Sequence, residues 1–221
     1  MLRELTHRIN NEMASTIGFI GCASARYRSE EVKAALDSVI RHISDSALVY
    51  RSLQMPIADE PIDAANYLHE LCRAISRAKL QHRGIELLFL QSPLKLSAAR
   101  CWRLGMIVSE LINNASRHAF GGDAGKIEVK LDHRGTFVNC TVSDNGPGSD
   151  RITPGQGLKI IHALARGLDG TVEHRSGPSG TIAILSFPVR SLAGDLTLCS
   201  RDLADGFANR QTGGVAREEE L

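Results

Sequence analysis

The side chains with the clearest chemical potential lie between residues 109 and 120 of this 221-residue chain. Glu110, Asn114, Arg117 and His118 recur at steps of three or four within an apolar-periodic run, so they share one face of a predicted helix. This face carries an acid, an amide and a cation. Few helices of a protein core need such a set, whereas a site that binds a magnesium polyphosphate does.

Two glycine-containing stretches follow. Asp144-x-Gly146-x-Gly148 closes a predicted strand. Aspartate before glycine is ordinary turn chemistry, but a carboxylate there can also accept a hydrogen bond from an exocyclic amine such as that of adenine, and glycine lets a flat ring approach the backbone. Gly155-x-Gly157 opens a predicted helix, whose free N–H groups and positive dipole end suit phosphates. A simple loop-to-helix turn explains this second pair equally well.

The heptad spacing of residues 1 to about 55 predicts a helical hairpin. The seam of the second arm contains Val32, Leu36, Val39, Ile43, Ser46, Tyr50 and Leu53. Ser29 is the predicted N-cap of this arm. Because each arm buries only one stripe, we expect a homodimer in which two hairpins form a four-helix bundle.

The remainder predicts an α+β fold. A helix capped by Asp63 is followed by a strand near residues 84–90, and Ser97 is the predicted cap of the long helix. Alternating apolar residues then predict strands over 127–131, 137–143, 171–174 and 181–187 around the glycine-opened helix. This order fits a two-layer α/β sandwich with a mixed sheet. We expect a hairpin domain over residues 1–57, a second domain over 58–190 and a mobile tail over 191–221.

Composition narrows the function classes. The net charge of +1 gives no basic excess that would favour nucleic acid. The five cysteines are odd in number and contain no C-x-x-C pair, so neither a disulfide framework nor a zinc ribbon is indicated. No apolar run approaches the roughly 18–20 residues of a transmembrane helix. We therefore expect a reduced, cytoplasmic protein without membrane insertion.

The motifs occur in one order: the acid–amide helix, D-x-G-x-G, G-x-G, and Gly180-Thr181 opening the last strand. This order resembles the N, G1, G2 and glycine-threonine motifs of the ATPase superfamily shared by gyrase and sensor histidine kinases. By that resemblance Asn114 ligates Mg²⁺ bridging the phosphates of ATP, Glu110 is a base or positions water, and Asp144 recognises adenine. The other expected ATP contacts are Arg117 or His118 at the phosphates, Thr181 beside adenine, and the residues that shape the site and its lid, Gly146, Gly148, Gly155, Gly157 and Leu158.

The stretch from Glu4 to Asn11 resembles the H-R-V-x-N phosphoacceptor box of the HWE-like histidine kinases and their relatives with the second type of dimerisation domain. The form of the long helix from Asn114 to Phe120 is typical of the same group. The apolar spacing of the first arm alone places His7 on the solvent-exposed face of its helix. His42, in the second arm, is the other candidate phosphoacceptor. The resemblance implies that His7 accepts the ATP γ-phosphoryl group and passes it to an aspartate of a receiver-domain protein, a response regulator.

Three departures from the family bear on this expectation. The lid, Ser149 to Pro154, is short, which favours weak ATP binding. Arg8 stands where ordinary histidine kinases carry an acid, so the residue that assists transfer is not identified. No sensor domain precedes the hairpin, so either a separate sensor protein supplies the input or the chain is a fragment. Two alternatives stay open: a histidine phosphotransferase that uses no ATP, and an ATP-regulated protein that sequesters a partner.

Overall fold

The computed structural model describes residues 2–56, 58, 60–147 and 156–189, apart from the side chains of residues 2–10, 134 and 156. The predicted tail over 191–221, together with Gly148, Gly155 and the short lid between them, lies outside this description. Within the described ranges, no helix is both long enough and apolar enough to span a membrane.

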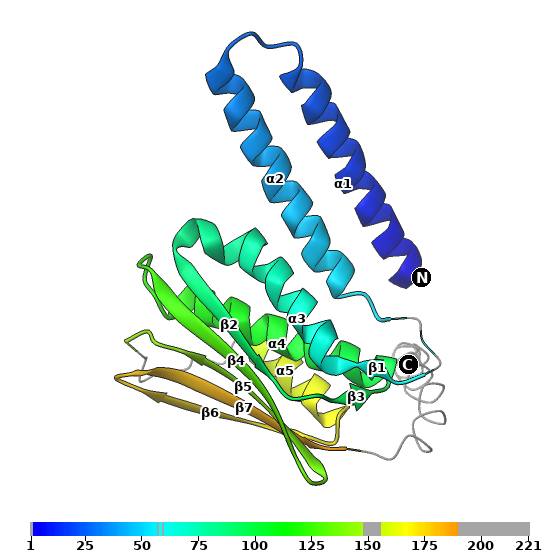
Figure 1. Ribbon diagram of the computed structural model, residues 1–221, viewed down its shortest axis with the longest axis vertical. Helices are drawn as coiled ribbons and strands as arrows, with labels where there is room; N and C mark the ends of the chain where they lie inside the picture. Colours follow the sequence, from blue (N-terminus) through cyan, green and yellow to red (C-terminus); the bar gives the residue numbers. More distant parts are fainter. Residues whose placement is uncertain (1, 57, 59, 148–155, 190–221) are drawn as a thin grey trace, which may run out of the picture. The chain divides into compact units, whose positions relative to one another are not determined.

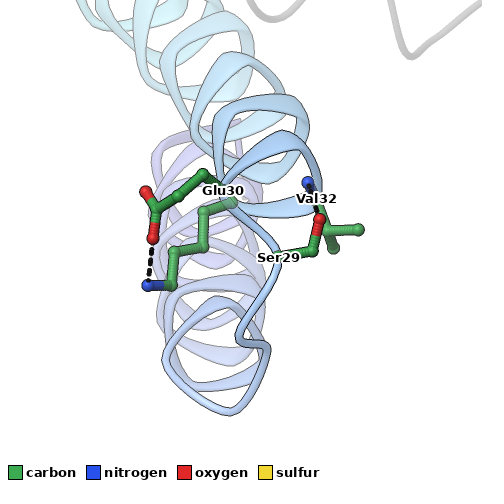
Figure 2. A network of polar contacts seen from close by, with 4 residues as sticks. Ser29, Glu30 and Val32 are labelled. Carbon is green, nitrogen blue, oxygen red and sulfur yellow. Dashed lines mark hydrogen bonds and ion pairs between the residues drawn. The ribbon is translucent and has the colours of Figure 1, made fainter.

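The hairpin consists of α1 (Leu2–Ser24) and α2 (Glu30–Ser52), which pack along each other (Figure 1). Ser29 caps α2 as predicted, because its backbone is extended and its hydroxyl accepts a hydrogen bond from the Val32 N–H at 3.4 Å (Figure 2). Within the first turn, Lys33 donates to Glu30 at 2.8 Å. The Ser29 hydroxyl satisfies one of the backbone amides that have no intrahelical partner at a helix start. The Glu30 carboxylate lies where the positive end of the helix dipole favours negative charge.

Among the described residues, five helical segments follow the hairpin. They are α3 (Ala64–Ile75), its π-helical continuation η1 (Ser76–Leu80), the 3-10 turn η2 (Gln81–Arg83), α4 (Ala98–His118) and α5 (Gln156–Arg166). Asp63 caps α3 as predicted: its Oδ1 accepts from the N–H groups of Ala65 and Asn66, each at 3.0 Å. The prediction for Ser97 is only half right. It occupies the N-cap position of α4, but its hydroxyl makes no capping hydrogen bond.

The main sheet has five strands in the order β2-β4-β5-β7-β6. Their bounds are β2 (Ile85–Gln91), β4 (Gly125–Arg134), β5 (Phe137–Asp144), β6 (Thr171–Gly177) and β7 (Gly180–Pro188). Strands β2 and β4 pair in parallel and all other neighbours are antiparallel, which makes the sheet mixed as predicted. A separate two-residue pair, β1 (Ile62–Asp63) with β3 (Lys95–Leu96), was not predicted.

Helices α3, α4 and α5 cover one face of this sheet (Figure 1). The strands present alternate side chains to that layer: Val138, Cys140 and Val142 of β5 are buried, whereas Asn139 and Thr141 between them are half-buried. Period-two alternation of this kind is expected of a sheet with one covered face. The two layers and the mixed sheet confirm the α+β prediction.

Helix α4 connects this core to the polar residues Glu110 and Asn114. The side chains that α4 buries among the helices and the sheet include Leu104, Ile107, Val108, Leu111 and Ile112. They recur at three- and four-residue steps and define one apolar stripe. The opposite edge of the same helix is therefore fixed in orientation by the core.

Candidate functional site

Four of the expected site residues lie on α4. Glu110 and Asn114, one helical turn apart, are both half-buried, whereas Arg117 and His118 in the last turn are exposed. Arg117 stands where the negative end of the helix dipole favours positive charge. The helix thus brings an acid and an amide together at the edge of the core with basic side chains beyond them, as the spacing predicted.

Asp144, at the end of β5, holds two chain segments together. Its Oδ1 accepts a hydrogen bond from the Gly146 N–H at 3.1 Å and another from the Thr181 N–H at 3.2 Å. The carboxylate therefore connects the turn after β5 to the start of β7, across 37 residues of sequence. Both of these hydrogen bonds use Oδ1.

The start of β7 passes very close to Asp144. Gly180 has φ = 125°, a conformation that L side chains rarely adopt, and a Cβ added to it would overlap the Asp144 carbonyl oxygen. Next to it, the Thr181 hydroxyl lies 3.4 Å from that of Ser176 on β6. The glycine-threonine pair thus places a backbone N–H at the carboxylate, which explains why a glycine precedes the threonine.

The glycines of the site lie against α4. A Cβ added to Gly157, at the start of α5, would overlap Oε1 of Glu110. A Cβ added to Gly146 would overlap the carbonyl oxygen of Ala119, the C-cap residue of α4. Leu158 is half-buried and packs on the core. The N-terminal part of α5 and the turn after β5 therefore both approach α4 closely enough to exclude any larger residue.

The remaining expected residues are less fully described. His7 lies within α1, and its side chain is outside the description. His42, the competing histidine, is exposed on α2. Gly148 and Gly155 belong to the undescribed segment between β5 and α5.

One side chain of this region was missed at the sequence level. Lys79, on η1, donates from Nζ to Oδ1 of Asn113 at 3.0 Å. Burial and the nearby Arg117 guanidinium lower the pKa of the Lys79 ammonium, and the Glu110 carboxylate acts in the opposite direction. The sequence does contain one indication of this role. Lys79 comes four residues after Ile75, at a position where the apolar stripe of α3 would continue with another core residue.

Taken together, the site combines a carboxylate and amide on one helix, cations beside them, and glycine turns that approach the same helix. Such a set can bind a purine through Asp144 and an anionic phosphate chain through the α4 edge. With a mixed five-stranded sheet covered on one face by helices, it defines an ATP-binding domain of the type shared by gyrase and sensor histidine kinases.

Family comparisons agree with that class. Residues 102–191 match the model for the histidine kinase-, DNA gyrase B- and HSP90-like ATPase (HATPase_c), and residues 4–79 match the HisKA_2 histidine kinase model. The chain therefore combines a HisKA_2 histidine kinase region with a HATPase_c domain that follows it.

Two curated relatives cover most of the chain. It is 26% identical over 201 residues to the sensor histidine kinase PdtaS of Mycolicibacterium smegmatis, covering 85% of this chain and 39% of the relative. It is 27% identical over 200 residues to the blue-light-activated histidine kinase 2 of Erythrobacter litoralis, covering 85% of this chain and 57% of the relative. The chain thus spans less than two thirds of the length of either relative.

Solved structures support the fold. The histidine kinase domain of a blue-light activated histidine kinase from Erythrobacter litoralis aligns with a TM-score of 0.57 at 19% identity, over 81% of this chain and 96% of that one. At this level of identity the likeness concerns the architecture alone.

Proposed function

We propose that this chain is the core of an ATP-dependent histidine kinase, which phosphorylates His7 from ATP and passes the phosphoryl group to an aspartate of a response regulator. The observation that carries the nucleotide part is the convergence on α4: Gly157 lies against Glu110, and Asp144 holds the turn after β5 to the start of β7. The match to both family models supports the transfer part.

Asp144 is the proposed adenine-recognition residue. Because its Oδ1 already accepts two backbone amides, the carboxylate has a fixed orientation, and Oδ2 is available in this proposal for the exocyclic amine of adenine. Thr181 supports this contact by supplying one of the two amides. Gly146, Gly148, Gly155, Gly157 and Leu158 are the proposed residues that shape the site and its lid.

Asn114 is the proposed Mg²⁺ ligand. Asn114 offers an amide oxygen and Glu110 a carboxylate on successive turns of α4, and both are half-buried. These hard oxygen donors fit Mg²⁺, which usually takes few protein ligands and completes its shell with phosphate oxygens and water. When bound, the ion would neutralise charge on the phosphates, as would Arg117 or His118.

In the proposed transfer, the unprotonated ring nitrogen of His7 attacks the γ-phosphorus while the bond from phosphorus to the β–γ bridging oxygen breaks and ADP leaves. The proton on the other ring nitrogen passes to Glu110, directly or through water. A neutral imidazole is abundant at neutral pH because its ordinary pKa is about 6.5. In the second step, an aspartate oxygen of the receiver replaces the histidine nitrogen on phosphorus.

The hairpin is the proposed homodimer interface. Val32, Val39 and Tyr50 of the predicted seam are 36%, 46% and 50% exposed on α2, and a second hairpin would cover them. We further propose that residues 1–57 are the dimerisation and phosphoacceptor domain and residues 58–190 the catalytic domain. The requirement for ATP and the free thiols of Cys72, Cys101 and Cys140 support a cytoplasmic location.

A conservative substitution tests the nucleotide site. Asp144→Asn keeps one oxygen for the two backbone amides and replaces the other with an NH₂ group, which repels the adenine amine. We expect ATP affinity, measured by isothermal titration calorimetry with Mg²⁺, to fall by at least about tenfold, which is ~1.4 kcal/mol. Asp123→Asn, which removes the same charge from an exposed loop, should bind ATP like the wild type. If wild-type protein bound no ATP, the phosphotransferase alternative would replace the kinase.

A further inference from the structure

The proposed mechanism gives no role to Lys79, a half-buried cation at the polar edge of α4. Lys79 reaches the polar edge of α4 from η1, and its Nζ donates to Oδ1 of Asn113, 34 residues away, at 3.0 Å. Asn113 is next in sequence to Asn114, the proposed metal ligand. The ammonium group is thus fixed beside the nucleotide site rather than free in solvent.

The charges around this ammonium are unbalanced. Arg117 and Glu110 both act on Lys79, the first unfavourably and the second favourably, and burial adds a further penalty. Lys79 is half-buried and Arg117 is exposed, so two positive groups lie in the same region as the Glu110 carboxylate. Positive groups gathered in one region attract anions, and a polyphosphate would supply several negative oxygens.

The backbone that carries Lys79 is itself unusual. After Ile75 the α-helix changes to the π-helix Ser76–Leu80, in which Ala78 and Leu80 are buried while Lys79 is only half-buried. π-helical turns are rare and frequently occur at functional sites. In a continued α-helix, position 79 would fall on the apolar stripe. The π turn instead places the lysine at the boundary of the core.

A second basic residue provides a comparison. Arg83, on η2, donates to the hydroxyl of Ser116 on α4 at 2.8 Å, so it also connects this helical segment to α4 across 33 residues. The partners differ: Asn113, the partner of Lys79, is next in sequence to Asn114, whereas Ser116, the partner of Arg83, is a buried residue further along α4. Removing Arg83 therefore removes a similar contact between this helical segment and α4, at a residue that does not adjoin Asn114.

We propose that Lys79 is a phosphate-positioning residue, which joins Arg117 in holding the polyphosphate of ATP against the α4 edge. This inference rests on the proposed function, because it requires ATP at this site. It assigns to Lys79 an interaction with the phosphate chain and none with the adenosine part. A purely structural lysine would instead affect every ligand equally, through the stability of the domain.

Three variants of the full chain separate charge from structure. Lys79→Gln can keep a hydrogen bond to Asn113 but loses the charge, Lys79→Arg keeps the charge, and Arg83→Gln is the matched control. The ligands are ATP, by titration calorimetry, and adenosine, by ligand-observed NMR. We expect Lys79→Gln to weaken ATP about tenfold and leave adenosine unchanged, whereas the other two variants stay within about threefold of the wild type for both ligands.

Two results would overturn the inference: unchanged ATP affinity in Lys79→Gln, or an equal loss for ATP and adenosine. Absence of ATP binding by the wild type would instead contradict the proposed function itself.

A measurement on wild-type protein avoids any folding defect of the variants. Acylation of lysines followed by mass spectrometry should show that ATP slows modification of Lys79 and adenosine does not, with exposed Lys95 as the reference. Equal rates at Lys79 with and without ATP would contradict the proposal.

Discussion

The close passage of β7 over Asp144 predicts a large difference between two glycines of one turn. Gly177 and Gly180 are paired residues at the end of the β6–β7 hairpin. A Cβ on Gly177 would meet no atom within 4 Å, whereas a Cβ on Gly180 would overlap the Asp144 carbonyl oxygen, and Gly180 also has φ = 125°. The substitution Gly180→Ala therefore combines backbone strain with a clash against main-chain atoms.

The magnitude follows from these two effects. A residue forced into a rare backbone region costs about 1–3 kcal/mol, and a clash in a close-packed region adds about 1–3 kcal/mol. We expect Gly180→Ala to lower the free energy of unfolding by about 2–6 kcal/mol, and Gly177→Ala to change it by less than about 1 kcal/mol in either direction. Since about 1 kcal/mol shifts the Tm of a chain of this size by ~2–4 °C, the two variants are readily distinguished.

The assay is urea unfolding followed by far-ultraviolet circular dichroism. Gly180→Ala should also weaken ATP more than Gly177→Ala does, because it displaces the Thr181 N–H that holds the Asp144 carboxylate. Equal unfolding free energies for the two variants would refute the reasoning that the start of β7 is fixed by its approach to Asp144.

Two further predictions concern the hairpin and the thiols. Val39→Asp should convert a dimer to a monomer in sedimentation velocity at micromolar concentration, because it places a charge on the exposed seam. The control Ser38→Asp, at an exposed neighbouring position, should remain dimeric. A monomeric wild type would contradict the four-helix bundle. Burial raises the pKa of the Cys72 and Cys101 thiols to about 12. At pH 8 a thiol reagent should therefore modify exposed Cys22 and leave these two thiols unreacted until the protein is unfolded. Rapid labelling of either thiol in the native protein would contradict its burial.

Much of the architecture followed from local patterns. Period-two alternation located β4, β5 and β7 because one face of the sheet is buried, and the steps of three and four in α4 oriented Glu110 and Asn114 together. Ser29 and Asp63 were predictable as caps because capping is decided within a few residues. These features depend on short-range geometry, which the sequence encodes directly.

The missed features depend on tertiary contacts. The hydrogen bond from Lys79 to Asn113 spans 34 residues, and the lysine interrupts an apolar stripe, so a pattern-based reading gave it no role. The two-residue pairing of Ile62 with Leu96 is too short to produce any periodicity. Ser97 has the right type and position for a cap, yet its hydroxyl makes no capping bond, because type and position alone do not fix a side-chain rotamer.

Transfer of phosphate to His7 is the most direct test of the account. The full chain, incubated with Mg²⁺ and ATP labelled at the γ-phosphate, should acquire a label that acid removes and alkali does not. The label should disappear in His7→Ala and persist in His42→Ala, the matched change on the exposed face of α2. A label that survives in His7→Ala, or its absence from wild-type protein that binds ATP, would contradict the assignment of a histidine kinase with His7 as its phosphoacceptor.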